Sequence, residues 1–382
     1  MKWQVPLFDL NYDAAEQEAA LAVIRSGWLT QGEKTAEFER AFAERLGARF
    51  AHAVSSCTTG LHLALRCLGL GPGDEVIVPS LTFVASVSTI VQTGATPVFA
   101  DVESADRPLL DPEDVRRKIS DRTRAIVAVH YAGYPCNMSR LGELAQKHNL
   151  SLIEDCAHCP LAEWHGRKLG TFGAAGVFSF FSNKNLSTGE GGMIVTNDPE
   201  LAGKVGLLRS HAMTHQTLDR HKGHAFEYDV VDLGYNYRFD EIRAAIGLVQ
   251  LGKLESANSR RAECDAHYRN RLAEIEWIQI PFQPPLEGRS AYHLFPIVLK
   301  EGAPRRDRLM PFLRDRGIQT SIHYRPVHTF TFYRRNYPTS DETLPQTAAL
   351  EPRLLTLPLY PTLTREQQKT VVESLRAAAA EL

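Results

Sequence analysis

The chain has 382 residues, of which 43% are hydrophobic and 23% charged, a balance typical of a folded globular protein with room for two domains. Its 43 lysines and arginines nearly match its 45 aspartates and glutamates, so we expect no binding to nucleic acid or to anionic membranes. No apolar stretch reaches about 18 residues and the first residues do not resemble a signal peptide, so we expect a cytoplasmic protein.

The first two thirds of the chain alternate short apolar runs with helical patterns. Helices are expected over Asp13 to Arg25 and Thr35 to Leu46, because each is followed by a glycine. We expect strands at 50–54, 75–79, 96–101, 125–130, 151–155, 176–180 and 193–196, and helices at 61–68, 83–91, 112–119 and 139–148. Apolar strands separated by helices predict a mainly parallel sheet with helices on both faces.

The pattern changes after about residue 250. A long charged helix is expected from Lys253 to Glu274, followed by strands at 293–299 and 318–323 with a helix at 306–316 between them. The last helix should begin at Thr364, because Thr364 and Gln367 form a capping box. We therefore divide the chain into a large α/β domain, residues 1–252, and a small C-terminal α+β domain, residues 253–382.

Six cysteines in a chain of this length do not indicate a disulfide framework. Cys156 and Cys159 form a CxxC pair, but a structural zinc site would require a second ligand pair at similar spacing, and the sequence has none. A redox pair requires a CxxC at a helix start after a strand, which this position allows. We favour small thiols packed behind a strand end, and we expect no metal.

Two segments after predicted strands have residues suited to a phosphorylated aromatic ligand. Ser55 to Gly60 lies between a strand and a helix, where small residues and free N–H groups suit a phosphate, although serine and threonine there are also ordinary helix caps. Asp155 closes an apolar strand, where a carboxylate can keep a cofactor ring nitrogen protonated or simply be a buried hydrogen-bonding acid.

Three more segments add to this group. Lys184 follows an aromatic strand and precedes a glycine-rich turn, a setting in which a partly deprotonated amine can form a Schiff base with an aldehyde. Phe83 follows another strand, where its ring can stack on a planar ligand or pack in the core. Gly234 to Arg238 form a polar aromatic turn before a helix capped by Asp240.

Seven motifs occur in an order that resembles one family. They are SSCTTGLHLAL, GPGDEVIVPSLTFVAS, GATPVFADV, IEDCAH, FSFFSNKNLSTGEGGMIVTND, LGYNYRFDEIRAAIGLVQL and HYRPVH. Together they resemble the DegT/DnrJ-type sugar aminotransferases, which use pyridoxal 5'-phosphate (PLP), over about residues 28–358. The resemblance implies the PLP-dependent transferase fold type I, that of aspartate aminotransferase, with a mainly parallel central sheet between helices and a smaller C-terminal α+β domain.

The resemblance also implies a role for particular residues. Lys184 would hold the cofactor and move the proton, and Asp155 would pair with its ring nitrogen. The remaining cofactor contacts would be Cys57, Thr58 and Ser179 at the phosphate, Phe83 on the ring face, His158 near the ring hydroxyl, and Asn236 at the phosphate of the neighbouring subunit. The protein would thus be a homodimer with shared sites. On the substrate side, the resemblance points to Trp28, Thr30, His323 and Tyr324.

This sequence departs from the family pattern in a few places. Cys57 stands where glycine is more frequent, and Cys156 and Cys159 stand where alanine is usual, so we expect changes in packing rather than in chemistry. The segment from Thr214 to Tyr228 looks longer and more basic than in many relatives, and two interpretations stay open: contact with an anionic part of the substrate, or a solvated loop.

The leading hypothesis is an aminotransferase that moves an amino group from glutamate or glutamine to a ketone of a nucleotide-activated sugar, with pyridoxamine phosphate as the intermediate cofactor form. Amination of a cyclitol ketone is the alternative within the same chemistry. A regulatory or binding protein without turnover is the alternative outside it, and Lys184 with Asp155 disfavours that interpretation. Some relatives have histidine in place of the lysine and catalyse dehydration, and Lys184 argues against that activity here.

Overall fold

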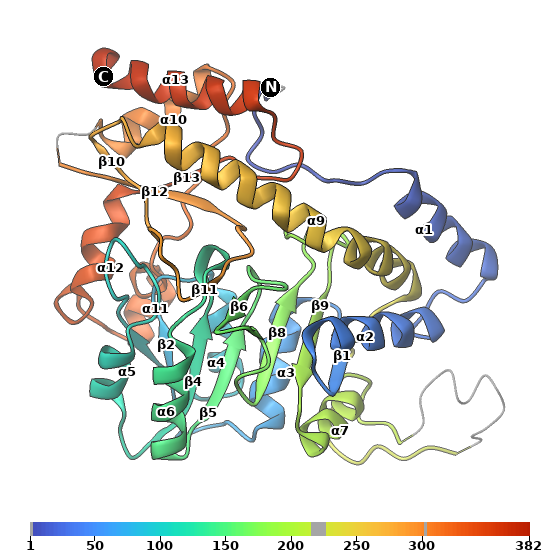
Figure 1. Cartoon of the computed structure of the whole chain (residues 1–382). Helices are drawn as coiled ribbons and strands as arrows, with labels where there is room; N and C mark the ends of the chain where they lie inside the picture. The colour runs from blue at the N-terminus through green and yellow to red at the C-terminus, as the bar shows by residue number, and fades with distance from the viewer. Residues whose placement is uncertain (1–2, 215–226, 302–303) are drawn as a thin grey trace.

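The computed structural model describes residues 3–214, 227–301 and 304–382 and has a seven-stranded sheet at its centre (Figure 1). The strand order is β1-β9-β8-β5-β4-β2-β3. Neighbours from β3 to β8 are parallel, whereas β9 is antiparallel to both β8 and β1, which confirms a mainly parallel sheet. The strands are β1 (Phe50–Val54), β2 (Glu75–Pro79), β3 (Thr96–Ala100), β4 (Thr123–Val129), β5 (Ser151–Asp155), β8 (Ala175–Ser179) and β9 (Gly192–Thr196).

Helices cover both faces of this sheet, because the alternating side chains of its strands are apolar on both sides. In β2, Ile77 belongs to a buried cluster with Phe38 of α2, whereas Val76 belongs to a second cluster with Leu63 of α3. The first cluster packs under α2 (Glu33–Leu46), α5 (Pro112–Lys118) and α6 (Met138–His148). The second packs under α3 (Cys57–Cys67), α4 (Ala85–Gln92) and α7 (Pro199–Leu208).

A smaller C-terminal part packs around a third buried cluster. Its sheet has the order β10-β12-β13, and it is covered by α10 (Arg306–Asp315) and α13 (Arg365–Glu381). As expected, Thr364 and Gln367 form a capping box at the start of α13. The remaining elements are β10 (Ile278–Gln279), β12 (Phe295–Leu299), β13 (Leu354–Leu357), β6 (Glu163–Trp164), β7 (Arg167–Lys168), β11 (Gly288–Arg289), α1 (Ala14–Ser26), α11 (Thr331–Asn336), α12 (Pro345–Leu350) and the 3-10 turns Tyr131–Gly133, Val327–Thr329, Asp341–Thr343 and Glu351–Arg353.

One continuous helix, α9 (Glu241–Leu272), connects the two parts (Figure 1). The sequence interpretation expected a helix capped by Asp240 and a separate one from Lys253, but no turn signal interrupts them and Asp240 caps the whole element. The proposed division at 252/253 therefore falls inside α9. Near the other end of the chain, Val5 pairs with Ile318 and is buried in the third cluster, so the N-terminal segment packs with the C-terminal part.

The strand expected at 318–323 was wrong. Gln319 donates its N–H to Val5, but two residues later the N–H of Ser321 bonds to Thr356. Because the segment changes its hydrogen-bonding neighbour within two residues, it forms only isolated bridges. The strand that pairs with β12 is β13 instead. Among the described residues, no helix has both the length and the apolar character to cross a bilayer.

Candidate active site

A cavity of about 330 Å³ lies beyond the carboxyl ends of the parallel strands, where open α/β sheets bind ligands. Its lining comes from connections after β1, β2, β5 and β8 and from a segment of the C-terminal part. The sequence-predicted residues in this lining are Cys57, Thr58, Phe83, Asp155, His158, Ser179, Lys184, His323 and Tyr324. Residues that are far apart in the sequence therefore meet in one place.

Lys184 lies in the connection between β8 and β9. The ends of this connection are tied together by backbone bonds from Phe180 N–H to Gly191 and from Thr188 N–H to Phe180. Burial lowers the pKa of Lys184 to about 8, and the nearby charge of Asp155 partly opposes this shift. A lysine with such a pKa is uncharged often enough near neutral pH to attack an aldehyde.

Asp155 ends β5 and is 5% exposed. Burial raises the pKa of its carboxyl, while hydrogen bonds from the Ser86 hydroxyl (2.7 Å) and the Ala157 N–H (3.1 Å), together with the charge of Lys184, oppose that rise. Both carboxylate oxygens are therefore held by donors. A carboxylate fixed in this way can accept a proton-bearing ring nitrogen.

The start of α3 provides a cradle for a phosphate. Ser56 and Thr59 cap each other, and the helix then presents the N–H groups of Cys57 and Thr58 at its positive end. Gly192 packs so closely that an added Cβ would lie 2.7 Å from the Cys57 nitrogen. The side chain of Cys57 is buried, which raises the pKa of its thiol, so this residue contributes its backbone rather than a thiolate.

His158 has a neutral ring with one nitrogen still to be satisfied. Its Nε2 lies 2.9 Å from the Tyr324 hydroxyl, whereas its Nδ1 is buried and has no hydrogen-bond partner within the part of the chain that the structure describes. Burial lowers the pKa of His158 well below its ordinary value, and Lys184 adds to the effect. A neutral imidazole with a free nitrogen is suited to a hydroxyl of a bound ring.

Phe83 and His323 complete the cavity. The Phe83 side chain is 54% exposed, and its ring centre lies 5.9 Å from that of Tyr324. An exposed aromatic ring at the mouth of a cavity is available for stacking on a planar ligand. His323 Nδ1 lies 3.0 Å from the Thr356 hydroxyl, and burial lowers the pKa of His323 to about 4.

Three of the sequence-predicted residues do not line this cavity. Asn236 is exposed in the turn before α9, and Thr30 is exposed as well. Trp28 lies at another hollow, between α1, α2 and α9, where its Nε1 donates to Gln31. Most of the basic segment from Thr214 to Tyr228 lies outside the described residues, at 215–226.

The sequence interpretation missed several buried polar residues around the cavity. The Asn185 amide donates to the Asn258 side chain (2.8 Å) and to the Ala291 carbonyl (2.7 Å), so its oxygen faces His293 Nδ1 at 2.9 Å. His293 therefore carries its proton on Nδ1, and its ring lies 4.4 Å from that of His158. The sequence pattern placed His293 inside a strand at 293–299, whereas β12 begins only at Phe295 and His293 lies before it.

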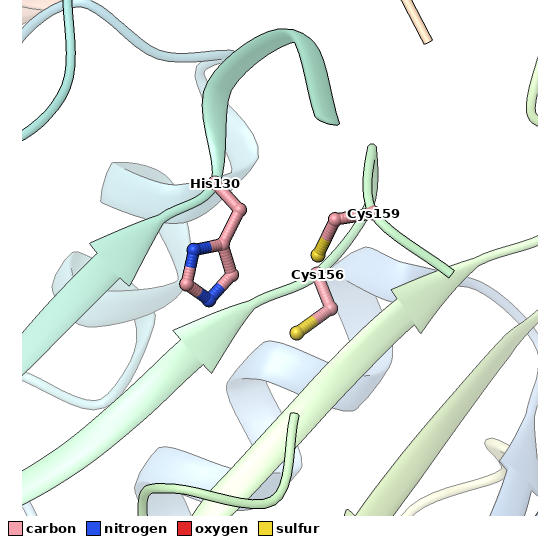
Figure 2. Close-up of side chains that lie close together, drawn as sticks. All are labelled: His130, Cys156 and Cys159. Atoms are coloured by element: carbon pink, nitrogen blue, oxygen red, sulfur yellow. The ribbon is translucent and has the colours of Figure 1, made fainter. Parts of the chain in front are cut away.

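The CxxC pair has a neighbour that its spacing does not reveal. Figure 2 shows Cys156 and Cys159, from the connection after β5, beside the ring of His130 at the end of β4; all three are fully buried, with their candidate ligand atoms within 4.8 Å of one another. However, His130 Nε2 lies 3.2 Å from a Glu154 oxygen, and Nδ1 accepts the Cys136 N–H at 3.2 Å. Because both ring nitrogens have partners, we interpret the thiols as packed side chains.

Four features occur together here: this sheet, a lysine with a lowered pKa, a buried carboxylate and an anion cradle. Together they define a fold type I enzyme that uses PLP. The chain matches the family model described as the DegT/DnrJ/EryC1/StrS aminotransferase family over residues 11–376. It therefore belongs to this family of PLP-dependent sugar aminotransferases.

Individual relatives agree with this assignment. The chain is 37% identical over 365 residues to the spore coat polysaccharide biosynthesis protein SpsC of Bacillus subtilis, covering 94% of this chain and 93% of that protein. It is 30% identical to Helicobacter pylori PseC, an aminotransferase of pseudoaminic acid biosynthesis, with a TM-score of 0.92 and full coverage of both chains. The PLP form of Streptococcus pneumoniae Spr1654 is 29% identical, with a TM-score of 0.91, covering 100% of this chain and 99% of that one, and a PMP form of Spr1654 is also known.

We expect capture of PLP by the apo-enzyme to depend on pH through Lys184. Only the uncharged amine attacks the aldehyde, so the rate should rise about tenfold per pH unit below pH 8 and level off above it, given a pKa of about 8. Stopped-flow absorbance after mixing apo-enzyme with PLP measures this rate. A rise that continued to pH 10 would show an ordinary lysine, and the Lys184→Ala variant serves as the blank.

Proposed function

We propose that this enzyme moves an amino group from glutamate or glutamine to the keto group of a nucleotide-activated sugar. The observation that carries the proposal is that Lys184, with its pKa lowered to about 8, and the buried Asp155 line the same cavity. The names of SpsC and PseC, which refer to a coat polysaccharide and to pseudoaminic acid, support a sugar as acceptor.

The cofactor residues have the roles that their positions favour. The N–H groups of Cys57 and Thr58 and the Ser179 hydroxyl bind the phosphate, Phe83 stacks on the ring, and His158 bonds to the ring hydroxyl. Bound PLP supplies an electron sink for the charge that develops at the carbon being deprotonated. Asp155 keeps the ring nitrogen protonated, which this sink requires.

Lys184 moves the proton. As a free amine beside the bound donor, Lys184 would remove the proton from the donor's α-carbon. In the second half-reaction it returns a proton to the acceptor carbon that receives the nitrogen. His323 and Tyr324 face this chemistry from the C-terminal part as uncharged groups, since burial lowers the pKa of His323 and raises that of Tyr324.

We also propose that each active site is shared between two copies of the chain. Exposed Asn236 has no side-chain hydrogen bond within the described chain, and it follows a run of exposed apolar residues, Val230, Val231 and Leu233, of which Leu233 is 71% exposed. Such a run favours an interface. The loop carrying Trp28 and Thr30 is anchored nearby, because the Glu241 carboxylate at the start of α9 accepts the Gly32 N–H at 2.8 Å.

Mixing two inactive variants tests the shared site. Lys184→Ala chains lack the amine and Asn236→Ala chains lack the amide supplied to the partner, so a mixed dimer regains one site with both groups. We expect subunit exchange to restore roughly a quarter of wild-type activity, because half of the dimers are then mixed and each has one of two sites intact. Mass spectrometry verifies the exchange. If mixed dimers form without activity, Asn236 acts only within its own chain.

The acceptor is identified by a single-turnover assay. Enzyme converted to the pyridoxamine phosphate form with glutamate or glutamine is mixed with a panel of nucleotide-linked ketosugars, their free ketosugars and cyclitol ketones. We expect the visible absorption of lysine-bound PLP to return only with a nucleotide-linked sugar. Return with a cyclitol ketone alone would contradict the proposed acceptor and establish the alternative. A Lys184→Ala control identifies any non-enzymatic reaction.

A further inference from the structure

Two buried hydroxyls stand in line behind Asp155. The Ser86 hydroxyl lies 2.7 Å from Asp155 Oδ2, and the Thr82 hydroxyl lies 2.8 Å from that of Ser86. Thr82 and Ser86 are each 1% exposed. Both residues belong to the connection from β2 into the first turn of α4, the same segment that carries Phe83. One short stretch of chain therefore provides the proposed ring-stacking residue and one of the two donors to the carboxylate.

The direction of these hydrogen bonds follows from the chemistry of the carboxylate. An ionised Asp155 can only accept, so Ser86 must commit its single hydroxyl proton to it. Ser86 can then only accept from Thr82, whose hydroxyl is the donor of the second bond. The order is thus Thr82 to Ser86 to Asp155, and each bond polarises the next.

We propose that Ser86, oriented by Thr82, is a positioning residue that keeps the cofactor's proton on the ring nitrogen rather than on Asp155. This inference rests on the proposed pairing of Asp155 with that nitrogen. A donor to the carboxylate stabilises the charged pair, carboxylate and protonated ring, over the neutral pair in which the proton has moved to the acid. Burial favours the neutral pair, so the donors at Asp155 decide the balance together with the nearby charge of Lys184.

A purely structural role makes a different prediction. If the hydroxyls only stabilised the start of α4, their removal would loosen the segment and weaken every ligand of the cavity alike. Thr89 is the matched control, because it lies on α4 and is fully buried, and because its hydroxyl, among the described residues, bonds only to the Ala85 carbonyl of its own helix. Thr89→Val removes a hydroxyl from the same helix without touching Asp155.

The experiment compares PLP with an analogue in which carbon replaces the ring nitrogen. We expect Ser86→Ala to weaken PLP binding to the apo-enzyme roughly tenfold and to leave binding of the analogue within about twofold. Thr82→Val keeps the shape of the threonine side chain and should weaken PLP binding about threefold. Thr89→Val should change the binding of neither PLP nor the analogue. In Ser86→Ala loaded with ¹⁵N-labelled PLP, the ring-nitrogen resonance should shift toward its unprotonated value.

Failure of the Ser86 role and failure of the proposed function give different results. Equal weakening of PLP and the analogue by Ser86→Ala, or an unmoved ¹⁵N resonance, would overturn the role of Ser86. Ser86→Cys, nearly the same size but a weaker donor, gives the same comparison if the alanine variant folds poorly. Asp155→Asn is measured alongside: if it, too, leaves the ¹⁵N resonance unmoved, the pairing of Asp155 with the ring nitrogen is the failed premise.

Discussion

Lys184→Ala is expected to lower amino transfer by on the order of 10⁴-fold or more and to abolish the visible absorption of lysine-bound PLP. The reason is that, in the proposed mechanism, Lys184 both holds the aldehyde and moves the proton; it lines the cavity, and burial lowers its pKa to about 8. Rapid-quench measurement of keto acid formed from glutamate gives the rate, and absorbance after gel filtration gives retained PLP.

Two controls separate lost chemistry from lost structure. Lys204→Ala removes an exposed lysine paired with Glu200 on α7 and should leave the rate unchanged. Added methylamine should partly restore Lys184→Ala, because a small amine can diffuse into the cavity and accept the proton. Retention of wild-type turnover by Lys184→Ala would remove the basis of the proposed mechanism.

Asp155→Asn should leave PLP bound but slow proton removal from the donor on the order of 10³-fold. The amide has nearly the shape of the carboxylate, and Ser86 can reverse its hydroxyl to accept from the amide nitrogen, so the fold should persist. What is lost is the negative charge that, in the proposed mechanism, keeps the ring nitrogen protonated. Single-turnover kinetics with glutamate measure the rate, and phosphate analysis measures bound PLP.

The rate and the PLP content of Asp155→Asn have to be compared with each other. A slow rate with full PLP content locates the defect in the electron sink, whereas a slow rate with lost PLP would show that Asp155 serves mainly in binding. Thr89→Val again provides a buried substitution in the same region that does not contact the carboxylate. A rate within a few fold of wild type would mean that another group protonates the ring.

The sequence by itself determined the local structure and the chemistry-bearing residues. β1, β2 and β5 occupy the predicted ranges, because a short apolar run bounded by turn residues can be buried in few other ways. Capping boxes such as that of Thr364 and Gln367 set helix ends through contacts within one turn of chain. Lys184 and Asp155 were also identifiable as candidates, since Asp155 ends such a strand and Lys184 comes a few residues after another, at the edge where parallel sheets bind ligands.

Only the tertiary structure decided which side chains meet. Ser86 and Asp155 are 69 positions apart, and Asn185 and Asn258 are 73 apart, so their hydrogen bonds depend on strand order and on where α9 crosses the sheet. Periodicity reports whether a residue is buried, but it carries no information on its partner. For the same reason the segment 318–323 alternates like a strand yet forms no ladder, because its two neighbours, Val5 and Thr356, come from opposite ends of the chain.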